Sequence, residues 1–91
     1  MANAMALKFP NSSRNYDAGK HCIRFKGYDT VFEVAFELDS AAIRRLSPVV
    51  GEDEGALLGA FDLNRERIER VAGRAYSKRR GDFIRLSASD F

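Results

Sequence analysis

His21 and Cys22 are neighbours in the chain, and a thiol beside an imidazole is a combination that nucleophilic enzymes use. The residues around this pair alternate between apolar and polar types, which is typical of a β-strand. Adjacent side chains of a strand point to opposite faces of a sheet, so the two groups cannot readily meet within one chain. We therefore predict an unreactive strand cysteine beside a surface or edge histidine.

Other catalytic and cofactor chemistry finds no support in the sequence. It contains no Gly-x-x-x-x-Gly-Lys phosphate loop, no His-Glu-x-x-His metal-binding helix and no Gly-x-Ser-x-Gly nucleophile elbow. A single cysteine also excludes an intramolecular disulfide and a zinc site built from several thiolates. The carboxylates of one helix flank, Asp62, Glu66 and Glu69, indicate a solvated face, with ion-pair spacing for Asp62–Arg65 and Glu66–Arg70. We predict no catalytic residue, no cofactor and no metal ligand.

A row of basic residues near the end of a predicted helix bears most on function. At 100° per residue, four of them project within about 80° of one another, and two more follow at the helix end. We call these six residues the basic row: Arg67, Arg70, Arg74, Lys78, Arg79 and Arg80. Such a row could neutralise several phosphates of a nucleic acid, giving salt-dependent and largely sequence-independent binding.

The basic row also has a purely structural interpretation. Cations gather at the C-terminal end of a helix because the helix dipole favours them, and arginine is a good solvated helix residue. No aromatic residues interleave with the row, so the stacking platform of a single-strand binder is missing. No second helix resembles the recognition helix of a helix-turn-helix protein. The sequence leaves both interpretations open.

Arg65 projects away from the basic row, onto the edge of the apolar side of the same helix, between Leu58 and Phe61. Two interpretations remain open for it. Arg65 either marks a binding site or fixes the helix to a loop or to the C-terminal tail. Its side chain is expected to pair with a carboxylate or to extend its head group to water.

The elements that must position these residues begin with a hairpin of two strands, Lys20–Lys26 and Val31–Leu38. Alternation places Ile23 and Phe25 on the apolar face of the first strand. In the second strand, the apolar face consists of Phe32, Val34, Phe36 and Leu38. With residues 27–30 as the turn, Lys26 faces Val31. The predicted cross-strand pairs are Phe25–Phe32, Ile23–Val34, Arg24–Glu33 and Lys20–Glu37.

Helices follow the hairpin. Asp39 or Ser40 can cap a short helix, Ala41–Leu46, that ends before Pro48. A long helix is predicted from Glu52 to the residues before Gly81, with a bend near Gly59. Its predicted apolar side consists of Leu57, Leu58, Phe61, Ile68, Val71, Ala72, Ala75 and Tyr76.

Three further segments complete the prediction. Asp82–Leu86 is a last strand, Leu7–Phe9 is a short edge strand, and residues 11–19 form a connecting loop. Residues 1–4 are interpreted as an upstream start or a cloning remnant, and residues 5–91 as one domain.

Composition places the chain among small folded domains. Its 91 residues are 45% hydrophobic and 31% charged with a net charge of +2, which fits neither a polycation nor a disordered acidic tail. No apolar run reaches the ~20 residues that span a bilayer, and the N-terminus lacks a secretory signal. We predict a cytoplasmic protein with no membrane partner.

Three runs together resemble a known family: Phe9-Pro10-Asn11 with Tyr16-Asp17, Phe61-x-x-Asn64-Arg65-x-x-Ile68, and Leu86-Ser87-x-x-Asp90-Phe91. In order and spacing, from about Met5 to Phe91, the sequence is similar to the bacterial domain-of-unknown-function family numbered 1488. The resemblance implies a bacterial origin and a compact α+β fold. It implies no established activity, and no site residue carries over from it.

We predict an α+β fold of the order ββααβ: a small, mainly antiparallel sheet of three strands, or four with Leu7–Phe9, covered on one face by the long helix and the short one. Exposed sheet edges or the outer helix face would permit a homodimer. The function expected by default is a non-enzymatic accessory or regulatory module that binds a macromolecule. The alternatives are nucleic-acid binding through the basic row, and a small-ligand binder or minor enzyme with a site near Tyr16, Tyr28 and Arg65.

Overall fold

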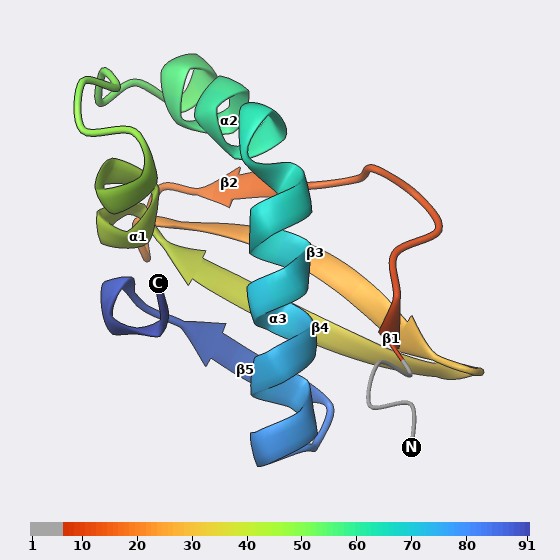
Figure 1. The fold of residues 1–91 in the computed structure, drawn as a ribbon. Coiled ribbons are helices and arrows are strands. Elements are labelled where there is room, and N and C mark those ends of the chain that lie inside the picture. Colours follow the sequence, from red (N-terminus) through yellow and green to blue (C-terminus); the bar gives the residue numbers. More distant parts are fainter. Residues whose placement is uncertain (1–6) are drawn as a thin grey trace.

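A computed structural model describes residues 7–91 of the chain as an α+β fold (Figure 1). The strands are β1 (Leu7–Lys8), β2 (Asn15–Asp17), β3 (Cys22–Asp29), β4 (Phe32–Asp39) and β5 (Phe83–Leu86). The helices are α1 (Ser40–Leu46), α2 (Glu54–Leu63), α3 (Arg65–Arg79) and the short 3₁₀ helix η1 (Ala88–Asp90). The prediction that residues 1–4 precede the domain lies outside the described residues.

The five strands form one mostly antiparallel sheet in the order β1-β3-β4-β5, with β2 also paired to β3. β1 and β2 therefore share the outer edge of β3, at opposite ends. β5 is the exception, because it runs parallel to β4. Parallel neighbours need a long crossover, and the three α-helices provide it.

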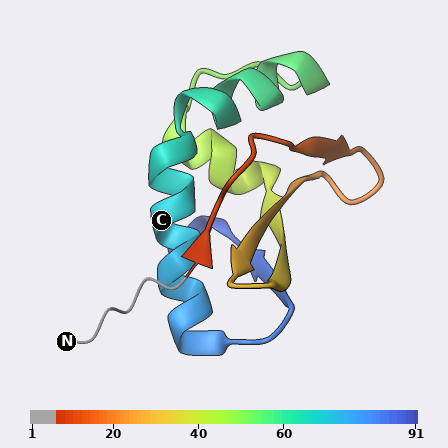
Figure 2. The same ribbon diagram turned by 90° about the vertical axis from the view of Figure 1, so that its right-hand side faces the viewer.

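The helices cover one face of the sheet and leave the other face bare (Figures 1 and 2). Alternate residues of β3, β4 and β5 point toward the helices and are buried there. The fully buried side chains of this core include Ile23, Phe36, Ile43, Phe61 and Ile68. The predicted faces of both hairpin strands and the predicted apolar side of the long helix are confirmed, except that Phe32 is 70% exposed at the hairpin tip.

The predicted hairpin register is wrong. In the structure, each residue of β3 lies opposite a residue of β4 that is four positions further along the chain than predicted. Arg24 lies opposite Glu37 rather than Glu33, Phe25 lies opposite Phe36, and Ile23 lies opposite Leu38. The strands run on to Asp29 and Phe32, so that Thr30 and Val31 alone form the turn. Because the shift is an even number of residues, every side chain keeps its predicted face.

Two local features explain this error. Gly27 lies inside β3 rather than in the turn, and a Cβ at this position would come within 2.8 Å of Cε1 of Phe9. A glycine inside a strand marks such a close approach. The true turn has Thr30 at φ 59°, a conformation that β-branched residues rarely adopt and that the sequence therefore does not announce.

The predicted long helix is in fact two helices that meet at Asn64, and the expected bend at Gly59 is absent. The Asn64 side chain donates to the Ala60 carbonyl at 2.9 Å and to Ser47 Oγ at 3.2 Å. An asparagine that binds the backbone and a distant loop in this way competes with continued helix. α2 and α3 therefore take different directions (Figure 1).

Short segments complete the comparison with the predictions. The edge strand at Leu7 and the last strand at Phe83–Leu86 are confirmed, but residues 11–19 contain β2, which was expected to be loop. β2 forms because Tyr16 packs against the core and Asp17 pairs with Arg24 at 2.9 Å. Within residues 7–91, no helix has the length and apolar character needed to cross a membrane.

Candidate functional site

The basic row lies along α3 and its C-terminal end, and four of its members share one exposed flank of the helix. This flank adjoins the side that Ile68, Val71, Ala72 and Ala75 bury. The four cations are all exposed and, within residues 7–91, none of them forms an ion pair. We call them the α3 cation face: Arg67, Arg70, Arg74 and Lys78. The predicted ion pair of Glu66 with Arg70 is among the contacts that do not form.

Arg79 has a different environment from the α3 cation face. It donates to the Arg85 carbonyl at 2.8 Å and pairs with Asp90 at 2.5 Å. The Asp82 carbonyl bonds to β4, so by alternation the Arg85 carbonyl points to the free edge of β5. Arg79 thus covers part of the free edge of β5 and ties it to η1. This reduces the capacity of the β5 edge to pair with another strand.

Arg80 also departs from the predicted row. Its guanidinium lies over the Tyr76 ring, 4.8 Å from the ring centroid. It is the residue that ends α3, with φ 55°, and the following Gly81 has φ 98°. Arg80 therefore lies on a different side of the helix end from Arg74 and Lys78, although it is exposed like them.

Cations elsewhere in residues 7–91 are mostly paired. Seven form ion pairs with carboxylates: Arg14, Lys20, Arg24, Lys26, Arg65, Arg79 and Arg85. Outside α3, the cations that form none are Lys8, Arg44, Arg45 and Arg80. Arg44 and Arg45 lie in the last turn of α1, and sequence reasoning passed over them although a helix C-terminus attracts cations.

Arg65 holds three segments together. It donates to the Ser12 carbonyl at 2.9 Å, pairs with Asp62 at 3.3 Å and with Glu69 at 3.6 Å. Its guanidinium also lies over the Phe61 ring at 4.8 Å. These contacts fix the helix junction to the β1–β2 loop, one of the two roles considered for this residue.

Arg14 reaches the same carboxylate from the loop side. Its guanidinium binds Asp62 with two hydrogen bonds, of 2.9 and 2.8 Å. The hydrogen bond from Arg14 holds the pKa of Asp62 below its usual value, with a smaller contribution from Arg65. The loop that forms one wall of the groove described next is therefore anchored at both Ser12 and Arg14.

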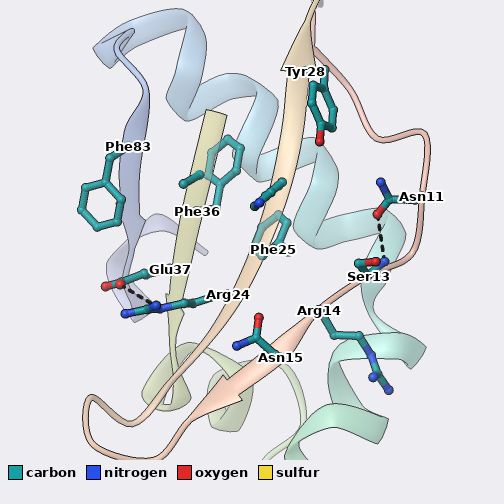
Figure 3. Close-up of a pocket in the computed structure, with 12 residues that line it drawn as sticks. Asn11, Ser13, Arg14, Asn15, Arg24, Phe25, Tyr28, Phe36, Glu37 and Phe83 are labelled. Atoms are coloured by element: carbon teal, nitrogen blue, oxygen red, sulfur yellow. Dashed lines mark hydrogen bonds and ion pairs between the residues drawn. The ribbon is translucent and has the colours of Figure 1, made fainter. Parts of the chain in front are cut away.

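A groove of about 580 Å³ crosses the bare face of the sheet (Figure 3). The register places Lys26, Ala35 and Phe83 in one row across β3, β4 and β5. Ala35 has the smallest side chain of the three, so the row is lowest at its centre. Tyr28 lies at one end of the groove in Figure 3 and the Arg24–Glu37 ion pair at the other. The β1–β2 loop contributes Asn11, Ser13 and Arg14, and β2 contributes Asn15.

Glu37 anchors one end of the groove. Its carboxylate is only 6% exposed and contacts Arg24 at 3.3 Å, Arg85 at 3.3 Å and Lys20 at 3.6 Å. The predicted Lys20–Glu37 ion pair therefore forms, although the hairpin register from which it was predicted is wrong. Asp17 pairs with Arg24 and Asp39 with Arg85, so the whole cluster is balanced in charge.

Cys22 lies beside this cluster and is completely buried. Burial raises the pKa of the Cys22 thiol, and the nearby charges of Glu37 and Asp17 raise it further. His21 is exposed, in the turn before β3, with φ 51°. Among the residues that the structure describes, no group of three or more histidine, cysteine, aspartate or glutamate side chains could hold a metal ion.

The structure does not assemble the small-ligand site considered around Tyr16, Tyr28 and Arg65. Of these three residues, only Tyr28 lines the groove. Tyr16 packs against the core on the helix side of the sheet, and Arg65 is held at the helix junction. Sequence reasoning missed the groove because its centre depends on which residues lie opposite Ala35.

The comparisons with known proteins place this chain in a family. The family model described as "Protein of unknown function (DUF1488)" matches residues 7–86. The chain belongs to this family. No curated protein and no solved structure shows significant similarity to it.

Two residues of this DUF1488 protein that carried the family resemblance now have evident structural roles. Asn64 ends α2 and binds Ser47, and Arg65 holds the β1–β2 loop. A third, Asp90, lies beyond the matched range, where it binds the Ser87 amide at 2.8 Å and pairs with Arg79. These three residues of the resembling runs therefore join segments of the chain, and none of them belongs to the α3 cation face or to the lining of the groove.

Proposed function

We propose that this DUF1488 protein is a non-enzymatic binding module that holds a nucleic acid against the α3 cation face. The observation that supports the proposal is the lack of ion pairs on that face within residues 7–91, in a chain whose other cations are mostly paired. A polyanion would supply the missing negative charge.

Leaving these cations unpaired carries a cost within the folded chain. Arg70 and Arg74 are four residues apart, as are Arg74 and Lys78, so each pair places like charges next to each other on the helix. Such a pair destabilises a helix by about 0.2–0.5 kcal/mol. Bound phosphates would remove this repulsion, because they neutralise the cations and release condensed counterions from the nucleic acid.

The length of the face suits several phosphates of a duplex. Arg67 and Lys78 are eleven residues apart on α3, which corresponds to about 16 Å along a helix. Four cations over that distance give about four phosphate contacts. For B-DNA this predicts a slope of about −3.6 for log K against log [salt], and an affinity about 150-fold lower at 200 mM than at 50 mM salt.

Fluorescence anisotropy of a labelled 20-base-pair duplex, at 50 and 200 mM salt, tests the proposal. The variant Arg67→Gln/Arg74→Gln/Lys78→Gln keeps one cation of the face, and its slope should fall to about −0.9. A matched control changes three unpaired cations elsewhere: Lys8→Gln/Arg44→Gln/Arg45→Gln. Equal losses in both triple variants would mean that net charge alone is responsible. Absence of binding by the wild type at 50 mM would refute the proposal.

A further inference from the structure

We infer that the groove on the bare face of the sheet binds a small planar ligand that carries an anionic group. This face is opposite the helix layer, so the inference does not depend on nucleic-acid binding by α3 (Figure 2). Three properties of the groove support it: its size, its apolar centre and the excess of hydrogen-bond donors around that centre.

The groove has the size and shape of a small-molecule site. Its volume of about 580 Å³ lies within the ~300–1,000 Å³ that is usual for ligand pockets. Its walls come from separate parts of the chain, with β5 on one side and the anchored β1–β2 loop on the other (Figure 3). Because Arg14 and Arg65 tie this loop to the helices, the wall is held in place before a ligand arrives.

The centre of the groove suits a flat apolar group. Ala35 is half-buried at its floor, and Phe83 beside it keeps 52% of its surface exposed. A planar ring lying over Ala35 would contact the Phe83 ring and remove it from water, as aromatic pairs prefer. A larger residue than alanine at position 35 would fill this space.

The polar groups around the centre are mainly donors. Lys26, Ser13 and Asn15 present ammonium, hydroxyl and amide groups to the groove. The one carboxylate in the lining, Glu37, is buried and already contacts three cations. The Ser13 hydroxyl and the Asn15 amide can each donate or accept, whereas the Lys26 ammonium can only donate. With its carboxylate already paired, the described lining therefore has a cation and neutral donors to offer, which matches a carboxylate or another oxyanion.

Lys26 is the cation best able to bind that anion. It pairs with Glu33 at 3.2 Å, and the two side chains are 56% and 48% exposed. Exposed pairs of this kind are weak, so the ammonium can turn toward a ligand in the groove at little cost. Arg24, in contrast, is held between Asp17 and Glu37.

The test uses 2-naphthoate as an aromatic anion, 2-naphthylmethanol as its neutral analogue, and ¹H–¹⁵N NMR of the full chain. We expect saturable shifts of the Lys26, Ala35 and Phe83 amides with naphthoate, and at least about fivefold weaker binding of the neutral analogue. Lys26→Met should weaken naphthoate binding by a similar factor. Lys8→Met removes the same charge from the same face of the sheet, but Lys8 does not line the groove. This control variant should bind naphthoate as the wild type does.

A second variant tests the shape of the site. Ala35→Leu should abolish binding, since it fills the centre from the bare face and does not enter the core. If it fails to fold, Phe83→Ser removes the ring wall instead and should weaken binding at least about fivefold. Saturation elsewhere on the chain, no saturable shifts, or equal effects of Lys26→Met and Lys8→Met would each overturn the inference. Since the duplex titration measures α3, the two proposals succeed or fail separately.

Discussion

The contact between Gly27 and Phe9 leads to the sharpest stability prediction. A Cβ added at Gly27 would lie 2.8 Å from Cε1 of Phe9 and 3.1 Å from Cγ of Leu7. Contacts this short do not persist, so the Phe9 ring must move. That ring packs near Phe25 and Phe36, with centroid distances of 6.1 and 6.2 Å. Gly27→Ala should therefore disturb the packing of the aromatic core.

The expected magnitude combines two opposing effects. Alanine in place of glycine within a strand is favourable by roughly 0.5–1 kcal/mol when its side chain has room. Overpacking a filled site costs about 1–3 kcal/mol, and the half-buried Phe9 ring can relieve part of it by moving outward. We expect Gly27→Ala to lower the free energy of unfolding by about 1–2 kcal/mol. In a Phe9→Ala background the same change should be neutral or slightly stabilising.

Urea unfolding followed by circular dichroism measures this double-mutant cycle. The predicted coupling between positions 9 and 27 is about 1–2.5 kcal/mol, within the range found for residues in contact. Gly59→Ala is the matched control, because a Cβ at Gly59 in α2 meets nothing within 4 Å. It should stabilise the protein by up to about 1 kcal/mol. If Gly27→Ala destabilises the wild-type protein and the Phe9→Ala variant by the same amount, the steric explanation is wrong.

Two further predictions concern titrating groups. Burial raises the pKa of the Cys22 thiol. In native protein, iodoacetamide should therefore label Cys22 more than about tenfold slower than free cysteine, and in guanidinium the two rates should be equal. Native labelling as fast as that of free cysteine would contradict this prediction. The hydrogen bond from Arg14 lowers the folded pKa of Asp62, so its stabilisation is present above the unfolded pKa and lost as pH falls through the folded value. Arg14→Gln should cost about 0.2–1 kcal/mol at pH 7, because the pair is partly exposed, and almost nothing at pH 2.5. Urea titrations at both pH values measure this difference, and an equal loss at both would show that the ion pair is not its source.

The two binding surfaces differ in how they acquire their charge. On the α3 cation face the four cations lie at helical spacing and form no ion pair within residues 7–91. On the bare face of the sheet, Lys26 and the cluster around Glu37 are balanced by carboxylates from neighbouring strands. In our proposals, net charge would attract a polyanion to the first surface, whereas the geometry of the donors and the apolar floor would select a small ligand at the second.

The sequence alone determined which side of each element is buried. Alternation in β3 and β4 and the helical spacing of Leu57, Phe61 and Ile68 are local patterns, and burial follows them because each element must hide its apolar side. The signals at the start of α2 and at the end of α3 are also local, since Asp53 caps α2 and Gly81 follows α3. The position of the cations on α3 required nothing more than this spacing.

Only the tertiary structure decided which residues meet. Several hairpin registers satisfy the same alternation, and the contact of Phe9 with Gly27 and the strained Thr30 turn accompany the one that forms. Asn64 ends α2 with the help of Ser47, seventeen residues away. The groove likewise exists because β5 returns beside β4 and places Phe83 next to Ala35. A local pattern specifies the face on which a side chain lies, but its partner is chosen by contacts between distant parts of the chain, which no window of sequence contains.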